Sequence, residues 1–365
     1  MKANFLGIGV LLLMVATQFG CSNEVEVIGE WEDIPVVYGI IDLTKDTNYI
    51  RVERAYLPKS KSALEVAKDP DSLYFDPNDV VITMLAEVGG QFVPLPNPLE
   101  RVDLAAEGIN RDEGIFANDP AYAYRMVGHR GNAFRLQIEN KKTGNTFTAT
   151  TEEIRTDNAF ITLKPSYNPG TKPIAFVEDK NGDIAFLSQV VDLTDNFAAI
   201  FDVGVRFYYK EYEVDASGNQ VASTIQDKFV EFKARRNFVP ENSNQFDVVL
   251  NGESFYAALN SNLSAVTGSN TRRCGGYIEF YVDGASTSLR EYVSAVSANQ
   301  GLVGGLYPAD PFSNIEGGYG VLACSNRAVR TVNTLMQMSD LTYEYLADSE
   351  MTSALGFEDR TSPCY

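Results

Sequence analysis

The chain has 365 residues, of which 44% are hydrophobic, and a formal net charge of −19. A chain this acidic is a poor candidate for nucleic-acid binding, which requires clustered Lys and Arg. Its single His excludes a His-rich zinc site and disfavours a Ser-His-Asp triad, and its length suggests two domains.

The N-terminus has the order of a lipoprotein signal. Lys2 precedes an apolar run over residues 5–16, which is too short to span a bilayer and has the length of a signal-peptide hydrophobic region. Gly20 then stands directly before Cys21. The order of charged, apolar, small and Cys resembles a bacterial lipoprotein signal, in which the cysteine is lipidated.

Two residues depart from that signal, because Gln18 and Phe19 stand where Leu and a small residue are usual. The alternative is an ordinary secretory signal with an incidental Cys. We expect residues 1–20 to be a signal peptide, Cys21 to carry the lipid and residues 21–31 to form an anchor linker.

Most of the remaining chain alternates between apolar and polar residues. In "FRLQIEN" the apolar Phe134, Leu136 and Ile138 share one face, and "VRFYYKEY", "KFVEFK" and "YIEFYV" behave similarly. Such alternation predicts half-buried strands. Tight-turn signals separate the strands at residues 89–90, 143–145, 181–182 and 217–219.

Helix signals are few. Segments 62–68 and 288–299 each begin with Ser and have Glu three residues later, as in a capping box. The C-terminal "LTYEYLADSEMTSALGF" has room for one or two short helical turns. We therefore predict a mainly β fold of two β-sandwich modules, residues 32–160 and 161–335, with a tail at 336–365.

Several stretches together resemble a family of uncharacterised Bacteroidota outer-membrane lipoproteins. They are "IPVVYGIIDLTKDTNYIRVERAYL", "DVVITMLAEVGGQFVPL", "GIFANDPAYAYRM", "NAFRLQIENKKTGNTFTATT", "SLREYVSAVSANQG" and "DPFSNIEGGYGVLACSN", of which Ser313 to Gly320 is the most specific part. The resemblance implies an immunoglobulin-like or transthyretin-like module, then a second β domain, placed beside TonB-dependent transporters. It transfers no catalytic residue. The three further cysteines and the tail past residue 335 depart from the family.

The resemblance also bears on localisation. Glu24, Glu26 and Glu30 follow Cys21 closely and are similar to the acidic surface-export tags of Bacteroidota lipoproteins. We expect an outer-membrane protein anchored by lipid, at the cell surface rather than on the periplasmic leaflet.

Three further cysteines, Cys274, Cys324 and Cys364, are candidates for a disulfide, because an oxidising envelope allows two of them to pair. All three pairings stay open, and none of the spacings is a metal spacing. Asp71-Ser72-Leu73 is similar to the Asp-Ser/Thr-apolar acceptor of Bacteroidota O-glycosylation, which makes Ser72 a candidate site.

No cofactor is expected. His129 lies in a predicted turn and is interpreted as a solvated loop residue. In "EDKNGD" (178–183) the glycine falls in the wrong register for an EF-hand, so a hairpin turn is favoured. The acidic segment 69–79 is a candidate calcium-stiffened loop, but a plain acidic loop is the preferred interpretation.

Tyrosines on outward strand positions, such as Tyr277 and Tyr281, are candidates for a contact surface, although packing between covered strands is the favoured interpretation. The glycines of segment 311–326 predict a tight turn at positive φ, followed by a strand in the second module's sheet. On this basis Gly318→Val is expected to be destabilising, whereas the functional alternative is a tip that a partner's backbone approaches.

These features predict a lipid-anchored cell-envelope protein that acts without catalysis in binding or assembly. The resemblance adds a TonB-dependent transporter as partner. The alternatives are a surface adhesion or structural protein and, less favoured, a hydrolase that uses paired carboxylates.

Overall fold

The computed structural model describes residues 33–55, 62–110, 114, 120–128, 131–154, 162–165, 173–179, 184–192, 198–240, 245–300, 311–329 and 336–359. Its strands are β1 Pro35–Asp42, β2 Thr47–Arg54, β3 Val80–Val88, β4 Gln91–Pro94, β5 Glu100–Asp103, β6 Tyr122–Val127, β7 Phe134–Asn140, β8 Thr146–Thr150, β9 Thr162–Pro165, β10 Phe186–Asp192, β11 Ile200–Glu213, β12 Gln226–Phe238, β13 Gln245–Asn251, β14 Thr271–Ala285, β15 Ile315–Glu316, β16 Tyr319–Val329 and β17 Met336–Gln337. Its α-helices are α2 Ala63–Val66, α3 Pro70–Leu73, α4 Gly252–Asn262, α5 Thr287–Gln300 and α6 Asp340–Asp348, with short 3₁₀ turns at Ala222–Thr224 and Ser353–Leu355.

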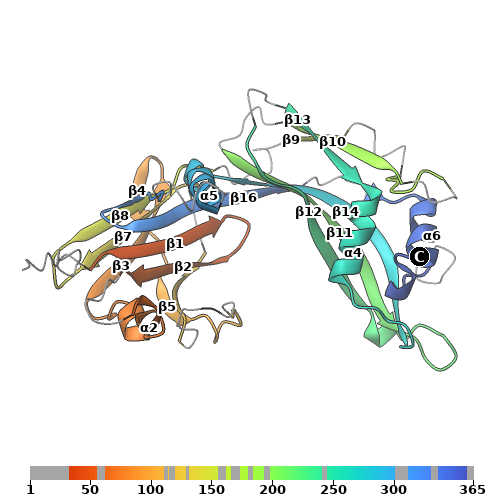
Figure 1. Ribbon diagram of the computed structural model, residues 1–365, viewed down its shortest axis with the longest axis horizontal. Coiled ribbons are helices and arrows are strands. Elements are labelled where there is room, and N and C mark those ends of the chain that lie inside the picture. Colours follow the sequence, from red (N-terminus) through yellow and green to blue (C-terminus); the bar gives the residue numbers. More distant parts are fainter. Residues whose placement is uncertain are drawn as a thin grey trace, which may run out of the picture.

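The predicted mainly β fold with short helices is confirmed. A nine-stranded sheet has the order β12-β11-β14-β16-β1-β2-β6-β5, and β17 pairs with β14 beside it. A five-stranded sheet has the order β15-β8-β7-β3-β4, and a three-stranded sheet has the order β13-β10-β9. Figure 1 shows two lobes, which the long sheet connects.

The first lobe is a sandwich of one end of the nine-stranded sheet and the five-stranded sheet. Val37, Ile41 and Ile50 face its core from β1 and β2, and Phe134 and Leu136 face it from β7. Along β7 buried and more exposed residues alternate, as the sequence predicts. The period of two therefore identifies the face of each strand that lies in the core.

The second lobe packs helices onto one face of β12, β11 and β14. Phe255 and Leu259 of α4, and Leu346 of α6, share a core with Phe207 of β11 and Phe280 of β14. The prediction that helix is limited to pieces near 62–68 and 288–299 is wrong, because α4 was not expected. Its start is nevertheless ordinary, since the side chain of Asn251 caps it by accepting a hydrogen bond from the Glu253 N–H at 2.7 Å.

β16 joins the two lobes. Residues 319–325 pair in parallel with β1, and residues 325–329 pair antiparallel with the end of β14. The sequence predicted this strand but placed it in the second module's sheet, whereas Leu322 and Cys324 lie in the core of the first lobe. One strand serves both lobes because its eleven residues are long enough to leave one lobe and enter the other.

The glycine-rich turn before β16 is present, with one correction. Gly317 and Gly320 have positive φ, of 74° and 106°, but Gly318 does not. Gly318 is instead confined by contact, since a Cβ there would lie 2.7 Å from the carbonyl oxygen of Pro35. The side chain of Asn314 ties this turn to β16, because its amide donates to the Leu322 carbonyl at 2.8 Å and accepts from the Leu322 N–H at 2.9 Å.

The predicted module boundary and the predicted C-terminal tail can each be compared with the structure. The predicted boundary at 155–172 lies mostly outside the described residues, which include only β9 there. Met338, Tyr343 and Phe357, which belong to the predicted tail, lie in the core of the second lobe. Within the described ranges no helix is both long and apolar enough to cross a membrane.

Candidate binding surface

The predicted site residues do not come together in one place. Cys21, His129 and Cys364 lie outside the described residues. Cys274 is disulfide-bonded, whereas Cys324 is a free, buried thiol in the first lobe.

Ser72 lies in the short helix α3 and is half-buried. Its hydroxyl donates a hydrogen bond to Asp69 at 2.8 Å, and the Asp69 side chain also accepts from the Asp71 N–H at the start of this helix. Two further acids of the segment are also engaged: Asp76 accepts from the Asn78 N–H, and Asp79 pairs with Lys142. The structure describes no group of three or more His, Cys, Asp or Glu side chains that could hold a metal ion.

A row of charged side chains crosses the face of β12, β11, β14 and β16 that lies opposite the second lobe's core. We call this the polar sheet face. Glu231 of β12 accepts from Arg206 of β11 at 3.0 and 3.1 Å and from Arg327 of β16 at 2.8 and 3.0 Å. Arg327 also donates to Asp283 of β14 at 2.6 and 2.9 Å, so the row ties four neighbouring strands together.

Aromatic rings lie beside this charged row. The rings of Tyr208 and Tyr277 are stacked with centroids 4.4 Å apart, and Phe229 packs against Tyr208 at 5.9 Å. The guanidinium of Arg206 lies 4.7 Å from the Phe229 ring centroid, and Tyr208 donates a hydrogen bond to Glu279 at 2.7 Å. Phe229 is nevertheless 54% exposed, so the cluster presents an apolar ring to solvent in a fixed frame.

The two tyrosines that the sequence placed on this surface differ. Tyr277 is half-buried in the stack with Tyr208, whereas Tyr281 is only 1% exposed, below the guanidinium of Arg327 at 3.9 Å. Packing is therefore the correct interpretation for Tyr281. Tyr277 belongs to the aromatic cluster and stays partly exposed, as a contact residue would.

Glu231, at the centre of the charged row, is held in the charged state. Burial opposes ionisation of Glu231, but the hydrogen bonds and charges of Arg327 and Arg206 outweigh it, so the pKa of Glu231 lies below its ordinary value. At the far end of β11, Glu211 has a lowered pKa for the same reason, because Lys228 and Arg273 outweigh the effect of burial.

A cavity of about 300 Å³ lies where α5 meets the polar sheet face. Leu289 and Val293 of α5 and Ile40 of β1 supply its apolar wall. Asp202 and Lys233, which form an ion pair at 2.5 Å, line its polar side. Its volume is at the lower limit of small-ligand pockets.

The residues that build this surface were not predicted from the sequence; they are Arg206, Tyr208, Phe229, Glu231 and Arg327. A signal was present in "VRFYYKEY" and "KFVEFK", where Arg206, Phe229 and Glu231 occupy the polar positions of the alternation. That pattern gives the face of each strand, but not which strands lie next to each other.

Comparisons with known proteins assign no family. No family model matches the chain, and no curated protein matches it. Among solved structures, the C-terminal globular domain of an oligosaccharyltransferase from Pyrococcus abyssi is similar over 62% of this chain and 41% of that chain, with 10% sequence identity and a TM-score of 0.17. This TM-score is too low for the similarity to bear on fold or function.

Proposed function

We propose that this protein is a lipid-anchored cell-envelope protein that binds a partner through the polar sheet face and acts without catalysis. The observation that carries the proposal is the aromatic cluster around Phe229. An exposed ring, fixed by stacked tyrosines and framed by ion pairs, has the composition of a protein contact site, in which aromatic residues and Arg are enriched.

The ionisation state of Glu231 supports binding rather than hydrolysis. A glycosidase of the usual kind needs one carboxylic acid with a raised pKa as proton donor. On the polar sheet face, Glu231 has the opposite shift, because two guanidinium groups hold it ionised. Its hydrogen bonds to Arg206 and Arg327 also occupy the oxygens that a general acid would present to a substrate.

The anchor and the partner are parts of the same proposal. Lipidation of Cys21 would hold the protein at the outer membrane, and the acidic residues that follow favour the cell surface. The family resemblance adds a TonB-dependent transporter as the partner. A surface adhesion or structural protein would use the same face and differ only in what it contacts.

Fractionation tests the anchor. Cys21→Ser is expected to move the protein from the membrane to the soluble envelope fraction. Unchanged partitioning into detergent would show that Cys21 carries no lipid. Protease treatment of intact cells tests the leaflet, since full protection would place the protein inside.

Site-specific crosslinking tests the surface. A photoreactive amino acid in place of Phe229 is expected to capture an envelope protein in intact cells. The matched control is the same substitution at Leu64 of α2, which is 55% exposed and lies in the other lobe. Equal capture from both positions, or none from Phe229, would contradict a role for the polar sheet face.

A further inference from the structure

β12 is the last strand of the nine-stranded sheet, and within the described residues no strand pairs with its outer edge. Its neighbour β11 pairs with it from Gln226 to Phe238. Most of its thirteen residues are exposed or half-buried, and it borders its lobe on the side that faces the other lobe (Figure 1). Such an edge presents a row of free backbone N–H and C=O groups.

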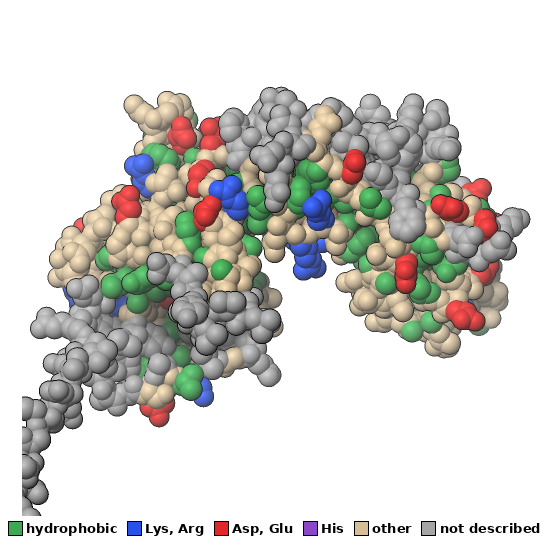
Figure 2. Space-filling view, turned by 45° about the horizontal axis from the view of Figure 1, so that its top comes forward, with side chains coloured by type: hydrophobic (Ala, Val, Ile, Leu, Met, Phe, Trp, Pro, Cys, Tyr) green, Lys and Arg blue, Asp and Glu red, His purple; other side chains and the backbone are tan. Residues whose placement is uncertain are grey.

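The same edge carries two exposed arginines, Arg235 and Arg236, which form no ion pair among the residues that the structure describes. Eight other arginines have carboxylate partners, namely Arg51, Arg54, Arg125, Arg206, Arg272, Arg273, Arg290 and Arg327. Arg101 and Arg135 also form no ion pair among the described residues, and each lies over an aromatic ring. In a chain with 49 acidic residues, two adjacent unpaired arginines are a local excess of positive charge. Figure 2 shows basic side chains on the underside of the connection between the lobes, where the surface is hollowed.

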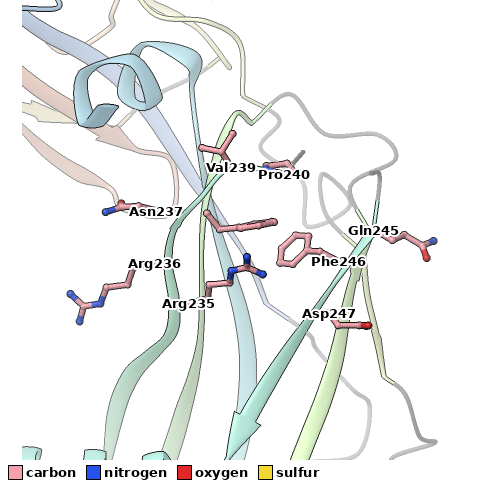
Figure 3. Close-up of a pocket in the computed structure, with 9 residues that line it drawn as sticks. Arg235, Arg236, Asn237, Val239, Pro240, Gln245, Phe246 and Asp247 are labelled. Atoms are coloured by element: carbon pink, nitrogen blue, oxygen red, sulfur yellow. The ribbon is translucent and has the colours of Figure 1, made fainter. Parts of the chain in front are cut away.

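The two arginines follow a β-bulge and, as consecutive residues of a strand, point to opposite faces of β12. The pairing with β11 shifts between Arg235–Val203 and Lys233–Gly204, which leaves Ala234 as the extra residue. Arg235 points toward β13, 3.6 Å from the Phe238 ring centroid, and Arg236 points the other way (Figure 3). A cleft of about 600 Å³ opens beside Arg235, where β12 and β13 diverge into separate sheets.

We propose that the free edge of β12 binds an extended, acidic segment of a partner protein by β-strand addition. The backbone of that segment would continue the sheet, and carboxylates on its two faces would meet Arg235 and Arg236. The inference rests on the proposed function, because it specifies the chemistry of the partner that the polar sheet face contacts.

Charged residues also protect edge strands against pairing with other chains, and short edges and bulges serve the same purpose. β12 differs from a protected edge in its length, and the stretch before the bulge, Gln226–Lys233, pairs regularly with β11. Lys228 and Lys233 on that stretch are neutralised by Glu211 and Asp202, so the excess charge is confined to Arg235 and Arg236. This arrangement repels basic strands and selects acidic ones.

A labelled peptide of repeating Val-Val-Glu-Glu, which carries carboxylates on both faces of a strand, tests the inference, with the purified full-length chain in mild detergent and fluorescence anisotropy as readout. The acidic peptide is expected to bind saturably, and its binding should weaken as salt is added. The matching peptide with Lys in place of Glu is expected not to bind. Arg235→Glu with Arg236→Glu is expected to weaken binding on the order of tenfold. The matched control is Lys68→Glu with Lys141→Glu, which makes the same charge change at two exposed lysines of the other lobe and should leave binding unchanged.

Backbone methylation separates strand addition from charge attraction. The Val and Glu peptide is N-methylated at every residue, which removes both rows of its backbone donors and leaves its charges unchanged. The methylated peptide is expected to lose binding, because neither of its edges can donate hydrogen bonds to β12.

Three outcomes would overturn the inference. Unchanged binding of the fully N-methylated peptide would exclude strand addition. Absence of binding by any acidic peptide, together with capture of a partner from position 229, would reject this edge and leave the proposed function standing. Self-association of the chain that disappears in the double arginine variant would identify a second copy as the occupant instead.

Discussion

Gly320 tests whether the close contact between β16 and β1 holds the first lobe together. It lies opposite Val37 in the parallel pair and has a φ of 106°, a conformation that side-chain-bearing residues rarely adopt. A Cβ at this position would lie 2.8 Å from the carbonyl carbon of Val37 and closer still to its oxygen. Because this obstacle is backbone of a central strand, it cannot turn aside as a side chain could.

Gly320→Ala is therefore expected to combine two costs. A non-glycine residue at an unfavourable positive φ costs about 1–3 kcal/mol. Overpacking against a rigid neighbour costs about 1–3 kcal/mol more. A total of about 4 kcal/mol corresponds to a fall in melting temperature on the order of 10 °C. Thermal unfolding followed by circular dichroism measures it.

Two matched variants separate these costs. Gly144 has a φ of 75° but nothing within 4 Å of an added Cβ, so Gly144→Ala should cost only about 1 kcal/mol. Gly318 lacks the positive φ but is confined by Pro35, so Gly318→Val tests contact alone and should fall between the other two. If Gly320→Ala melts within about 2 °C of Gly144→Ala, the argument for close contact between these strands is refuted.

Three further predictions concern single groups. Glu231→Gln should destabilise the protein by about 2 kcal/mol at pH 7. Because the pKa of Glu231 is lowered from 4.5, its contribution is present above that value and is lost as the pH falls through the folded-state pKa, so the difference in stability that urea unfolding measures should shrink as the pH is lowered below 4.5. Burial raises the pKa of the Cys324 thiol to about 12, so a maleimide at pH 8 should label it only after unfolding, and rapid labelling of the folded protein would contradict this. The Glu358 N–H donates a hydrogen bond to the carbonyl of Arg273 at 2.8 Å, so the chain passes beside the disulfide-bonded Cys274 shortly before it reaches Cys364. Peptide mapping without reduction should therefore find Cys274 linked to Cys364. A peptide that links Cys21 to Cys274 would contradict both this pairing and the lipid anchor.

The elements that follow from short-range sequence signals were predicted well. The alternation in β7 identified Phe134 and Leu136 as core residues, and the Ser288 signal located α5 within one residue of its observed start. α4 was missed because its apolar Phe255, Tyr256 and Leu259 follow a strand without a break, and only Asn251 signals the change.

The candidate surface was predictable only in part. Each strand's sequence shows which residues leave the core, and this suffices to place Phe229 and Glu231 on one face of β12. It does not show that Arg206 and Arg327 lie beside them, because those contacts join residues 25 and 96 positions apart in the chain. Long-range charge pairs leave no periodic signal in either partner.

The sequence by itself determined the mainly β character, the inward faces of the strands and the position of the glycine-rich turn, because each depends on neighbouring residues and local backbone geometry. Only the tertiary structure decided that β16 pairs in parallel with β1 and that one sheet runs through both lobes. It also decided that, within the described part of the chain, β12 ends that sheet and Arg235 and Arg236 form no ion pair. The physical reason is that backbone hydrogen bonds are alike for all strands. Partner choice therefore depends on side chains that meet across the fold, as where Gly320 leaves room for Val37.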